Sequence, residues 1–243
     1  MIVKMFAKTD VGRVRKKNQD SFLANAQIGL AIVADGIGGR KGGEVASKLA
    51  VDGIKNHFLD VNALRPDEIA PFLASSVDKV NQEIFTRGQS GDTAGMGTTL
   101  NCLLFAGDTL HVAHIGDSRT YLYYKGNLWQ LTLDHNMKVY GERGWIPKEI
   151  VETSSKSGAL VRALGLSPQC EVDIYEKQIR PGEIFLTCSD GLTGMVSDQK
   201  ITAIIRENEN VLERVPTLLV QEANRNGGKD NITVVLSQVA EGA

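Results

Sequence analysis

Four aspartates in this sequence stand at the ends of predicted strands, each beside or near glycine. Asp35 follows an apolar run at 30–34, Asp117 follows LHVAHIG, Asp190 follows EIFLTCS, and Asp230 precedes NITVVLS. If these strand ends gather at one edge of a sheet, several negative charges meet there, which is unfavourable unless a bound cation compensates them. Hard divalent cations with oxygen ligands, Mg²⁺ or Mn²⁺, are the natural partners of such a carboxylate cluster.

The stretch 30–43, LAIVADGIGGRKGG, carries the first of these carboxylates on a glycine-rich loop. A backbone with so few Cβ atoms can pass close to a ligand. An Asp-Gly dipeptide alone is ordinary in a turn between two strands. The recurrence of the arrangement is what favours a metal or phosphate site.

Two such ions ~3.5–4 Å apart would activate a water for in-line attack on phosphorus. Arg15 precedes Asp20 by five residues at the start of another predicted strand, so that a guanidinium and a carboxylate can project toward one place. The guanidinium would hold two phosphate oxygens as a fork-like donor. The predicted chemistry is hydrolysis of a phosphoester without a covalent intermediate.

Other phosphate- and metal-binding motifs do not fit. The sequence contains no G-x-x-x-x-G-K-[ST] loop and no D-x-[DN]-x-[DN]-G loop, and the glycines at 36 and 38 lack the G-x-G-x-x-G spacing. The four histidines are dispersed, and the three cysteines form no CxxC pair. A zinc site is therefore disfavoured.

Length and composition indicate one large domain spanning 1–243, since 42% of the residues are apolar, enough for a sizeable core. The formal net charge of −2 gives no reason to expect nucleic acid or a membrane as a partner. No stretch approaches the ~20 apolar residues that span a bilayer. We expect a cytoplasmic monomer with reduced cysteines.

The predicted elements alternate between groups of strands and pairs of helices, which indicates a layered α+β fold. The region 135–165 has weak periodicity, with short helical stretches possible around Val139 and at 148–152, and is interpreted as an inserted flap. Strands are expected at 1–7, 21–26, 30–34, within 98–132, and at 174–179, 183–188 and 232–239; helices are expected at 44–58, 66–87, 197–207 and 212–225.

The chain resembles the metal-dependent serine/threonine protein phosphatases of type 2C in their compact bacterial form. Eight stretches occur in the family's order: TDVGRVRKKNQD, VADGIGG, GTTL, HIGDSR, LTLDH, LVRALG, LTCSDGL and GGKDNITVV. The resemblance implies a four-layer αββα sandwich, in which two antiparallel sheets are flanked by helix pairs and a metal centre lies in a cleft at one end. The segment at about 135–159 matches the family's flap, which affects substrate choice.

The resemblance also implies roles for individual residues. Asp35 would bridge two metal ions, and the carbonyl oxygen of Gly36 would bind the first. Asp190 and Asp230 would ligate the second, whereas Asp20 would act mainly through waters. Arg15 would hold the substrate phosphate.

A third, weaker metal site is implied at Asp117 and Asp190. Supporting roles fall to Asn231, which would order the Asp230 loop, and to Ser118 and Arg119, which would support Asp117. These three residues are expected to be structural rather than catalytic.

The sequence departs from the family pattern in three places. Ile37 stands where some members have a histidine proposed to protonate the leaving group, so a metal-bound water is the expected acid. Gln19 replaces a frequent glutamate, which should weaken a water-mediated metal contact. The flap begins with an unusual Asn-Met-Lys-Val-Tyr, at 136–140.

The implied activity is removal of phosphate from phosphoserine and phosphothreonine in proteins, opposing a serine/threonine kinase. Two other interpretations stay open: a non-catalytic regulatory domain of the same fold, because fold alone does not imply activity, and a metal-dependent hydrolase of a small phosphorylated metabolite or nucleotide.

Overall fold

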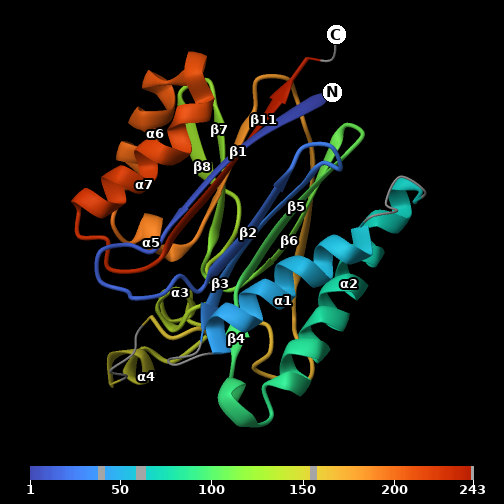
Figure 1. Cartoon of the computed structure of the whole chain (residues 1–243), viewed down its shortest axis with the longest axis vertical. Helices are drawn as coiled ribbons and strands as arrows, with labels where there is room; N and C mark the ends of the chain where they lie inside the picture. The colour runs from blue at the N-terminus through green and yellow to red at the C-terminus, as the bar shows by residue number, and fades with distance from the viewer. Residues whose placement is uncertain (38–41, 59–63, 154–157, 242–243) are drawn as a thin grey trace.

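Two antiparallel sheets lie face to face at the centre of the molecule, and helices cover both outer faces (Figure 1). The structure, a computed structural model, describes residues 1–37, 42–58, 64–153 and 158–241. The arrangement confirms the expected four-layer α+β sandwich.

One sheet has five strands in the order β1-β11-β10-β7-β8, and the other has five in the order β2-β3-β5-β6-β9 with the short β4 paired to the end of β3. Their bounds are β1 (Ile2–Asp10), β2 (Asp20–Asn25), β3 (Leu30–Ile37), β4 (Gly97–Thr98), β5 (Leu100–Ala106), β6 (Thr109–Ile115), β7 (Arg119–Tyr124), β8 (Asn127–Gln130), β9 (Asp173–Gln178), β10 (Ile184–Cys188) and β11 (Ile232–Ala240).

The central strands are apolar on both faces because each is covered on both sides. Along β3, Ala31 and Val33 point between the sheets, whereas Leu30 and Ile32 point to the helix layer. At the centre of the sandwich, Phe185 meets Phe105 edge to face, with ring centroids 5.7 Å apart. Continuous apolar runs in the sequence therefore correspond to buried strands.

Helices α1 and α2 cover the sheet that contains β3, and α5, α6 and α7 cover the sheet that contains β11 (Figure 1). The bounds of the helices in the described residues are α1 (Gly42–His57), α2 (Pro66–Arg87), η2 (Gly91–Thr93), α3 (Met137–Glu142), α4 (Lys148–Thr153), α5 (Asp190–Thr193), α6 (Asp198–Glu207), η3 (Glu209–Arg214) and α7 (Val215–Arg225). Ser197 caps the start of α6, since its hydroxyl accepts a hydrogen bond from the Lys200 amide at 3.3 Å.

Three expected boundaries are wrong by three residues. The first strand ends at Asp10 rather than at Ala7. The last helix begins at Val215 rather than at 212, because Pro216 suits the first turn of a helix and Val211 has non-helical dihedral angles. Strand β3 does not stop before Asp35 but runs to Ile37, since Gly36 and Ile37 pair with β4. The four-residue helix α5 was not predicted, because it is too short to show a period.

The flap holds the two short helices α3 and α4, as the sequence indicated. Its base is closed by an antiparallel bridge between Asn136 and Leu160, and part of it, 154–157, lies outside the described residues. Among the described residues, no helix has both the length and the apolar content needed to cross a bilayer.

We predict that Phe185→Ala lowers the free energy of unfolding by about 3–5 kcal/mol, because it opens a cavity between the sheets. Trp129→Ala, at a side chain that is 48% exposed on β8, is the control and should have a much smaller effect. Urea unfolding followed by circular dichroism measures both. Equal effects would contradict a tightly packed core at Phe185.

Candidate metal centre

Four aspartates from separate elements line one cleft, at the end of the sandwich where β4 and α3 lie (Figure 1). Asp35 belongs to β3, Asp117 follows β6, Asp190 begins α5, and Asp230 precedes β11. Arg15 lines the same cleft from the β1–β2 connection. The cavity has a volume of about 450 Å³. The predicted gathering of carboxylates at one edge is thus what the structure contains.

Asp20 lies behind this group rather than on the cleft surface. It faces Asp35 in the β2–β3 pairing, so the two side chains leave the same side of the ladder. Its Oδ2 accepts hydrogen bonds from the hydroxyls of Ser189, at 2.8 Å, and Thr233, at 2.6 Å. These contacts tie Asp20 of one sheet to two strand ends of the other.

The glycines that follow Asp35 and Asp190 allow close contact between backbones rather than a turn. A Cβ on Gly36 would collide with the backbone oxygen of Gly43, at the start of α1, and would lie 2.6 Å from the oxygen of Gln19. A Cβ on Gly191 would collide with the backbone oxygen of Asn231. In both cases a side chain would push apart the segments that carry the carboxylates.

Hydroxyl groups hold the Asp35 backbone in place. The Asp35 amide donates to Oγ1 of Thr99 at 2.9 Å, and its carbonyl accepts from Thr98 Oγ1 at the same distance. Thr99 also shares a 2.8 Å hydrogen bond with Ser118, the neighbour of Asp117. The GTTL segment therefore links the Asp35 strand to the Asp117 turn.

The Asp117 turn is further held by the base of the flap. The Gly116 amide donates to Nδ1 of His135 at 3.2 Å, and Nε2 of His135 lies 3.2 Å from Asp173. Since Nδ1 accepts, the proton is on Nε2 and faces the carboxylate. Of the expected supports of Asp117, Ser118 acts through Thr99, whereas Arg119 is paired with Asp134 at 2.8 and 2.7 Å and supports Asp117 only through its charge.

Asn231 ties the β1–β2 connection to Asp230, as expected. Its side chain accepts from the Gln19 amide at 2.8 Å and donates to the backbone oxygens of Val11 and Lys17, at 3.0 and 2.9 Å. This places Arg15 within reach of the carboxylates. Its Nη2 lies 2.6 Å from Asp230 Oδ2, while about half of its side-chain surface (51%) stays exposed.

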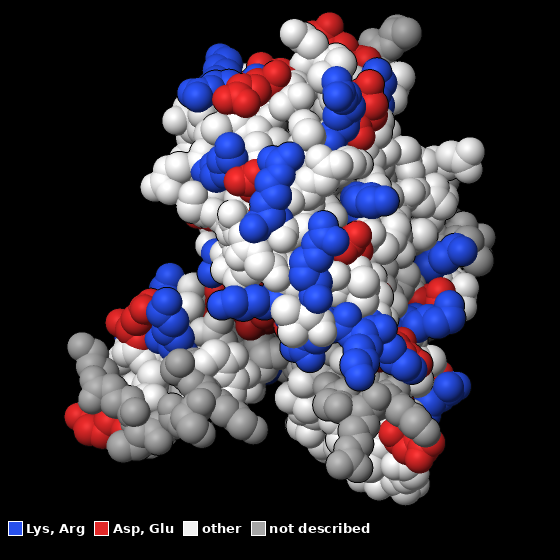
Figure 2. All heavy atoms as spheres, turned by 60° about the vertical axis from the view of Figure 1, so that its left-hand side comes forward, with Lys and Arg blue, Asp and Glu red and all other residues white. Residues whose placement is uncertain are grey.

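The same connection carries a run of exposed basic side chains, Arg13, Arg15, Lys16 and Lys17. Figure 2 shows the side of the molecule on which the connection lies. Lys and Arg side chains gather in the lower part of that face. Positive charge beside the cleft attracts anions toward it.

Burial and mutual repulsion raise the pKa values of the aspartates. Burial raises the pKa of Asp117 to about 7, with Asp190 adding to the effect. Burial raises the pKa of Asp20 to about 6, although the bonds from Thr233 and Ser189 oppose the shift. The pKa of Asp35 lies well above its usual value because of burial and four neighbouring aspartates, and that of Asp190 is raised by burial and by Asp230.

This donor set fits divalent cations. Oδ1 of Asp20 and Oδ1 of Asp190 are buried without a hydrogen-bond partner among the described residues, and cations would neutralise the repulsion that raises the pKa values. In the described part of the chain, no three acidic, histidine or cysteine side chains close on a single point. Backbone oxygen and water would therefore complete the coordination, as Mg²⁺ ordinarily requires.

Sequence reasoning missed the hydroxyls of Thr99, Ser189 and Thr233, and it missed His135, whose ring anchors the Asp117 turn. Each is next to a residue or inside a motif that was singled out, GTTL, LTCSDGL, NITVV and LTLDH. Their adjacency to the aspartates was a usable signal, but only the fold shows which partner each one binds.

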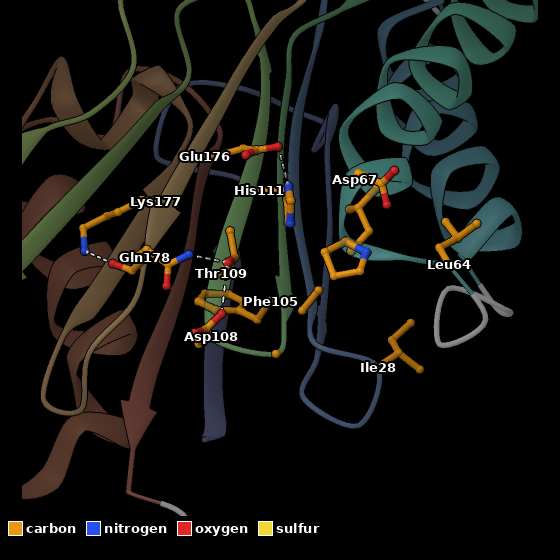
Figure 3. Close-up of a pocket in the computed structure, with 14 residues that line it drawn as sticks. Ile28, Leu64, Asp67, Phe105, Asp108, Thr109, His111, Glu176, Lys177 and Gln178 are labelled. Atoms are coloured by element: carbon orange, nitrogen blue, oxygen red, sulfur yellow. Dashed lines mark hydrogen bonds and ion pairs between the residues drawn. The ribbon is translucent and has the colours of Figure 1, made fainter.

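A larger cavity, of about 760 Å³, lies beneath the first turn of α2 and is shown in Figure 3. Two pairs of its polar groups lie close together along β6 and β9: His111 Nδ1 lies 3.3 Å from Glu176, and Gln178 donates to Thr109 at 2.9 Å. Volume alone does not identify the site, because it is the smaller cleft that gathers aspartates from four elements.

The chain is similar to known bacterial phosphatases over almost its whole length. It is 37% identical to the serine/threonine phosphatase stp of Listeria monocytogenes over 235 residues, covering 94% of this chain and 93% of that protein. The structure of the S. agalactiae serine/threonine phosphatase matches with a TM-score of 0.88 at 31% identity and covers 98% of this chain and 99% of that one.

The catalytic domain of the serine/threonine protein phosphatase PstP, solved in complex with two manganese ions, matches with a TM-score of 0.85 at 35% identity and covers 99% of each chain. The family model described as protein phosphatase 2C matches residues 13–223, a range that contains six of the seven residues with implied site roles and ends before Asp230. This chain therefore belongs to the protein phosphatase 2C family, as the sequence motifs indicated.

Proposed function

We propose that this protein hydrolyses phosphoserine and phosphothreonine in proteins, with Mn²⁺ or Mg²⁺ as cofactor. The observation that carries the proposal is the cleft in which Asp35, Asp117, Asp190 and Asp230 meet beside Arg15. Relatives named serine/threonine phosphatases, at 36–37% identity over nearly the full length of this chain, support the same activity.

In this proposal, Asp35 would be shared by two cations, because it is buried among four other aspartates whose negative charges act on it. The Gly36 carbonyl oxygen would also hold the first cation, and Asp190 and Asp230 would hold the second. Asp20 would contact the cations through water. Asp117 and Asp190 would hold a third cation more weakly.

Bound Mn²⁺ or Mg²⁺ would supply positive charge for the transferring phosphoryl group and activate a water for its hydrolysis. The chain itself orients the substrate. Arg15 is half exposed at the cleft and can turn two N–H groups toward phosphate oxygens. Its bond to Asp230 keeps the guanidinium at the cleft until the phosphate arrives.

No protonated side chain stands at the position after Gly36. Ile37 lines the cleft and has no proton to donate, so we propose that water protonates the leaving group. Gln19 also lines the cleft. Its backbone oxygen accepts a hydrogen bond from the Gly36 amide at 3.2 Å, so this oxygen holds the backbone of β3 in place instead of binding a cation.

We further propose that the protein is a cytoplasmic monomer formed by one domain, with the flap at about 135–159 affecting substrate choice. The three cysteines are free, which is typical of a reducing compartment. The partner reaction is phosphorylation by a serine/threonine kinase, because such a kinase makes the substrate that this site would consume.

We predict that hydrolysis of a phosphothreonine peptide requires added Mn²⁺ or Mg²⁺ and that Asp190→Ala lowers kcat/KM by more than the roughly 10–100-fold typical of losing an outer-shell partner. Asp52→Ala, on the exposed side of α1, should keep full activity. Initial rates of phosphate release measure both. In folded protein, metal-independent release or an active Asp190→Ala would refute the metal assignment, and a faster reaction with nucleotides would favour a metabolite hydrolase.

We predict that Arg15→Lys lowers kcat/KM by about 10–150-fold, which corresponds to the about 1.5–3 kcal/mol of a hydrogen bond to a charged group. Lysine keeps the positive charge but cannot form the bidentate hydrogen bonds of a planar guanidinium. Lys16→Arg is the matched control on the same connection and should have little effect. If Arg15→Lys left kcat/KM unchanged, Arg15 would not be the phosphate-holding residue.

We predict that Mn²⁺ stabilises the protein more at pH 7.5 than at pH 5.5. The raised pKa values mean that the metal-free folded state binds more protons than the unfolded state between about pH 4 and pH 7, so its stability falls as pH rises through that window. Bound cations offset this loss of stability at pH 7.5. At pH 5.5 they must compete with protons for the carboxylates, so they stabilise the protein less.

At a hundredfold excess over Kd, the expected stabilisation at pH 7.5 is about 2.7 kcal/mol, or roughly 5–10 °C in Tm for a chain of this size. Thermal unfolding with Mn²⁺ or with EDTA at both pH values measures it. An equal shift at both pH values would argue against titrating aspartates as the ligands.

A further inference from the structure

The cleft has one wall that the chemistry of the aspartates does not explain. Beside the carboxylates, its lining includes four apolar side chains, contributed by Ile37, Ala159, Leu160 and Leu166. Leu166 is 47% exposed and is one of few large apolar side chains so exposed in the described part of the chain. An exposed apolar surface next to a polar site is typical of a place where a ligand is bound.

Ile37 and Leu166 lie next to each other on this wall. Ile37 is paired with Gly97 between β3 and β4, and paired residues direct their Cβ atoms to the same face of a ladder. A Cβ built on Gly97 would lie 3.0 Å from Cδ2 of Leu166. Leu166 therefore occupies the space that the missing side chain of Gly97 leaves beside Ile37.

The backbone around Leu166 is held in place by hydrogen bonds. Leu164 forms a bridge with Thr98, with N–O distances of 2.9 and 3.0 Å. The Gly165 amide donates to Oδ1 of Asn81, which is fully buried, at 2.8 Å. Gly165 has a φ of +84°, a conformation that favours glycine and turns the chain so that Leu166 faces the cleft. The exposed leucine is thus placed in advance of any ligand.

We propose that Ile37 and Leu166 form an apolar subsite, which takes an apolar side chain adjacent to the phosphorylated residue of the substrate protein. The subsite rests on the proposed function and is continuous with the cleft that holds the phosphate. A charged side chain would lose water against these two residues without gaining an ion pair from them. The structure therefore selects phosphoproteins by the residue beside the phosphate as well as by the phosphate.

The test compares two phosphothreonine peptides that differ only in the residues flanking phosphothreonine, leucine in one and serine in the other. With Mn²⁺ present, the wild type should favour the leucine peptide by about 10-fold in kcat/KM, the low end for side chains entering apolar pockets, because this subsite is open. In Leu166→Ser the ratio should fall to near one, and in Leu166→Met it should be retained.

Ile2→Ser is the matched control, because Ile2 is 49% exposed on β1 and does not line the cleft. It should keep the wild-type ratio. Thermal unfolding of each variant verifies that it is folded. Equal rates for the two peptides in the wild type, or an unaltered ratio in Leu166→Ser, would overturn the subsite alone. Failure to hydrolyse either peptide would overturn the proposed function and the subsite with it.

Discussion

Repulsion among carboxylates in one partly buried cleft is the constraint on which the rest of the structure depends. Burial, together with the negative charges of Asp20, Asp190, Asp117 and Asp230, raises the pKa of Asp35 well above its usual value. Like charges separate unless a framework prevents it or cations neutralise them. The protein needs both, a rigid framework to bring the side chains together and cations to make the arrangement favourable.

The β-sandwich and the contacts between its two sheets form the framework that brings the carboxylates together. The four aspartates of the cleft surface each stand at or near the end of a strand whose residues are mostly buried, so packing between the layers fixes where these strand ends lie. The hydroxyls of Ser189 and Thr233 connect one sheet to Asp20 of the other, and Thr99 connects Asp35 to the Asp117 turn. The contacts that stabilise the fold therefore also set the geometry of the site.

Arg15 adds the opposite charge, but from a connection rather than from a strand. Asn231 binds that connection at two backbone oxygens and one amide, which lets a half-exposed guanidinium stay beside Asp230. Rigid carboxylates and a more accessible arginine suit a site in which the cations stay and the substrate comes and goes. The apolar pair Ile37 and Leu166, on another side of the same cleft, offers contact to the part of the substrate that carries no phosphate.

The sequence by itself determined the layered fold, the strands and the identity of the aspartates, because apolar runs and Asp-Gly patterns are local and the ordered motifs are specific. It did not determine that β3 continues through Asp35 to Ile37, that α7 begins at Val215, or that Asp20 lies behind the cleft. Those features depend on pairing with β4, on the kink at Val211 and on hydroxyls more than 160 residues away in the chain. Only the tertiary structure decided them, because contacts between distant segments leave no period or motif in the local sequence.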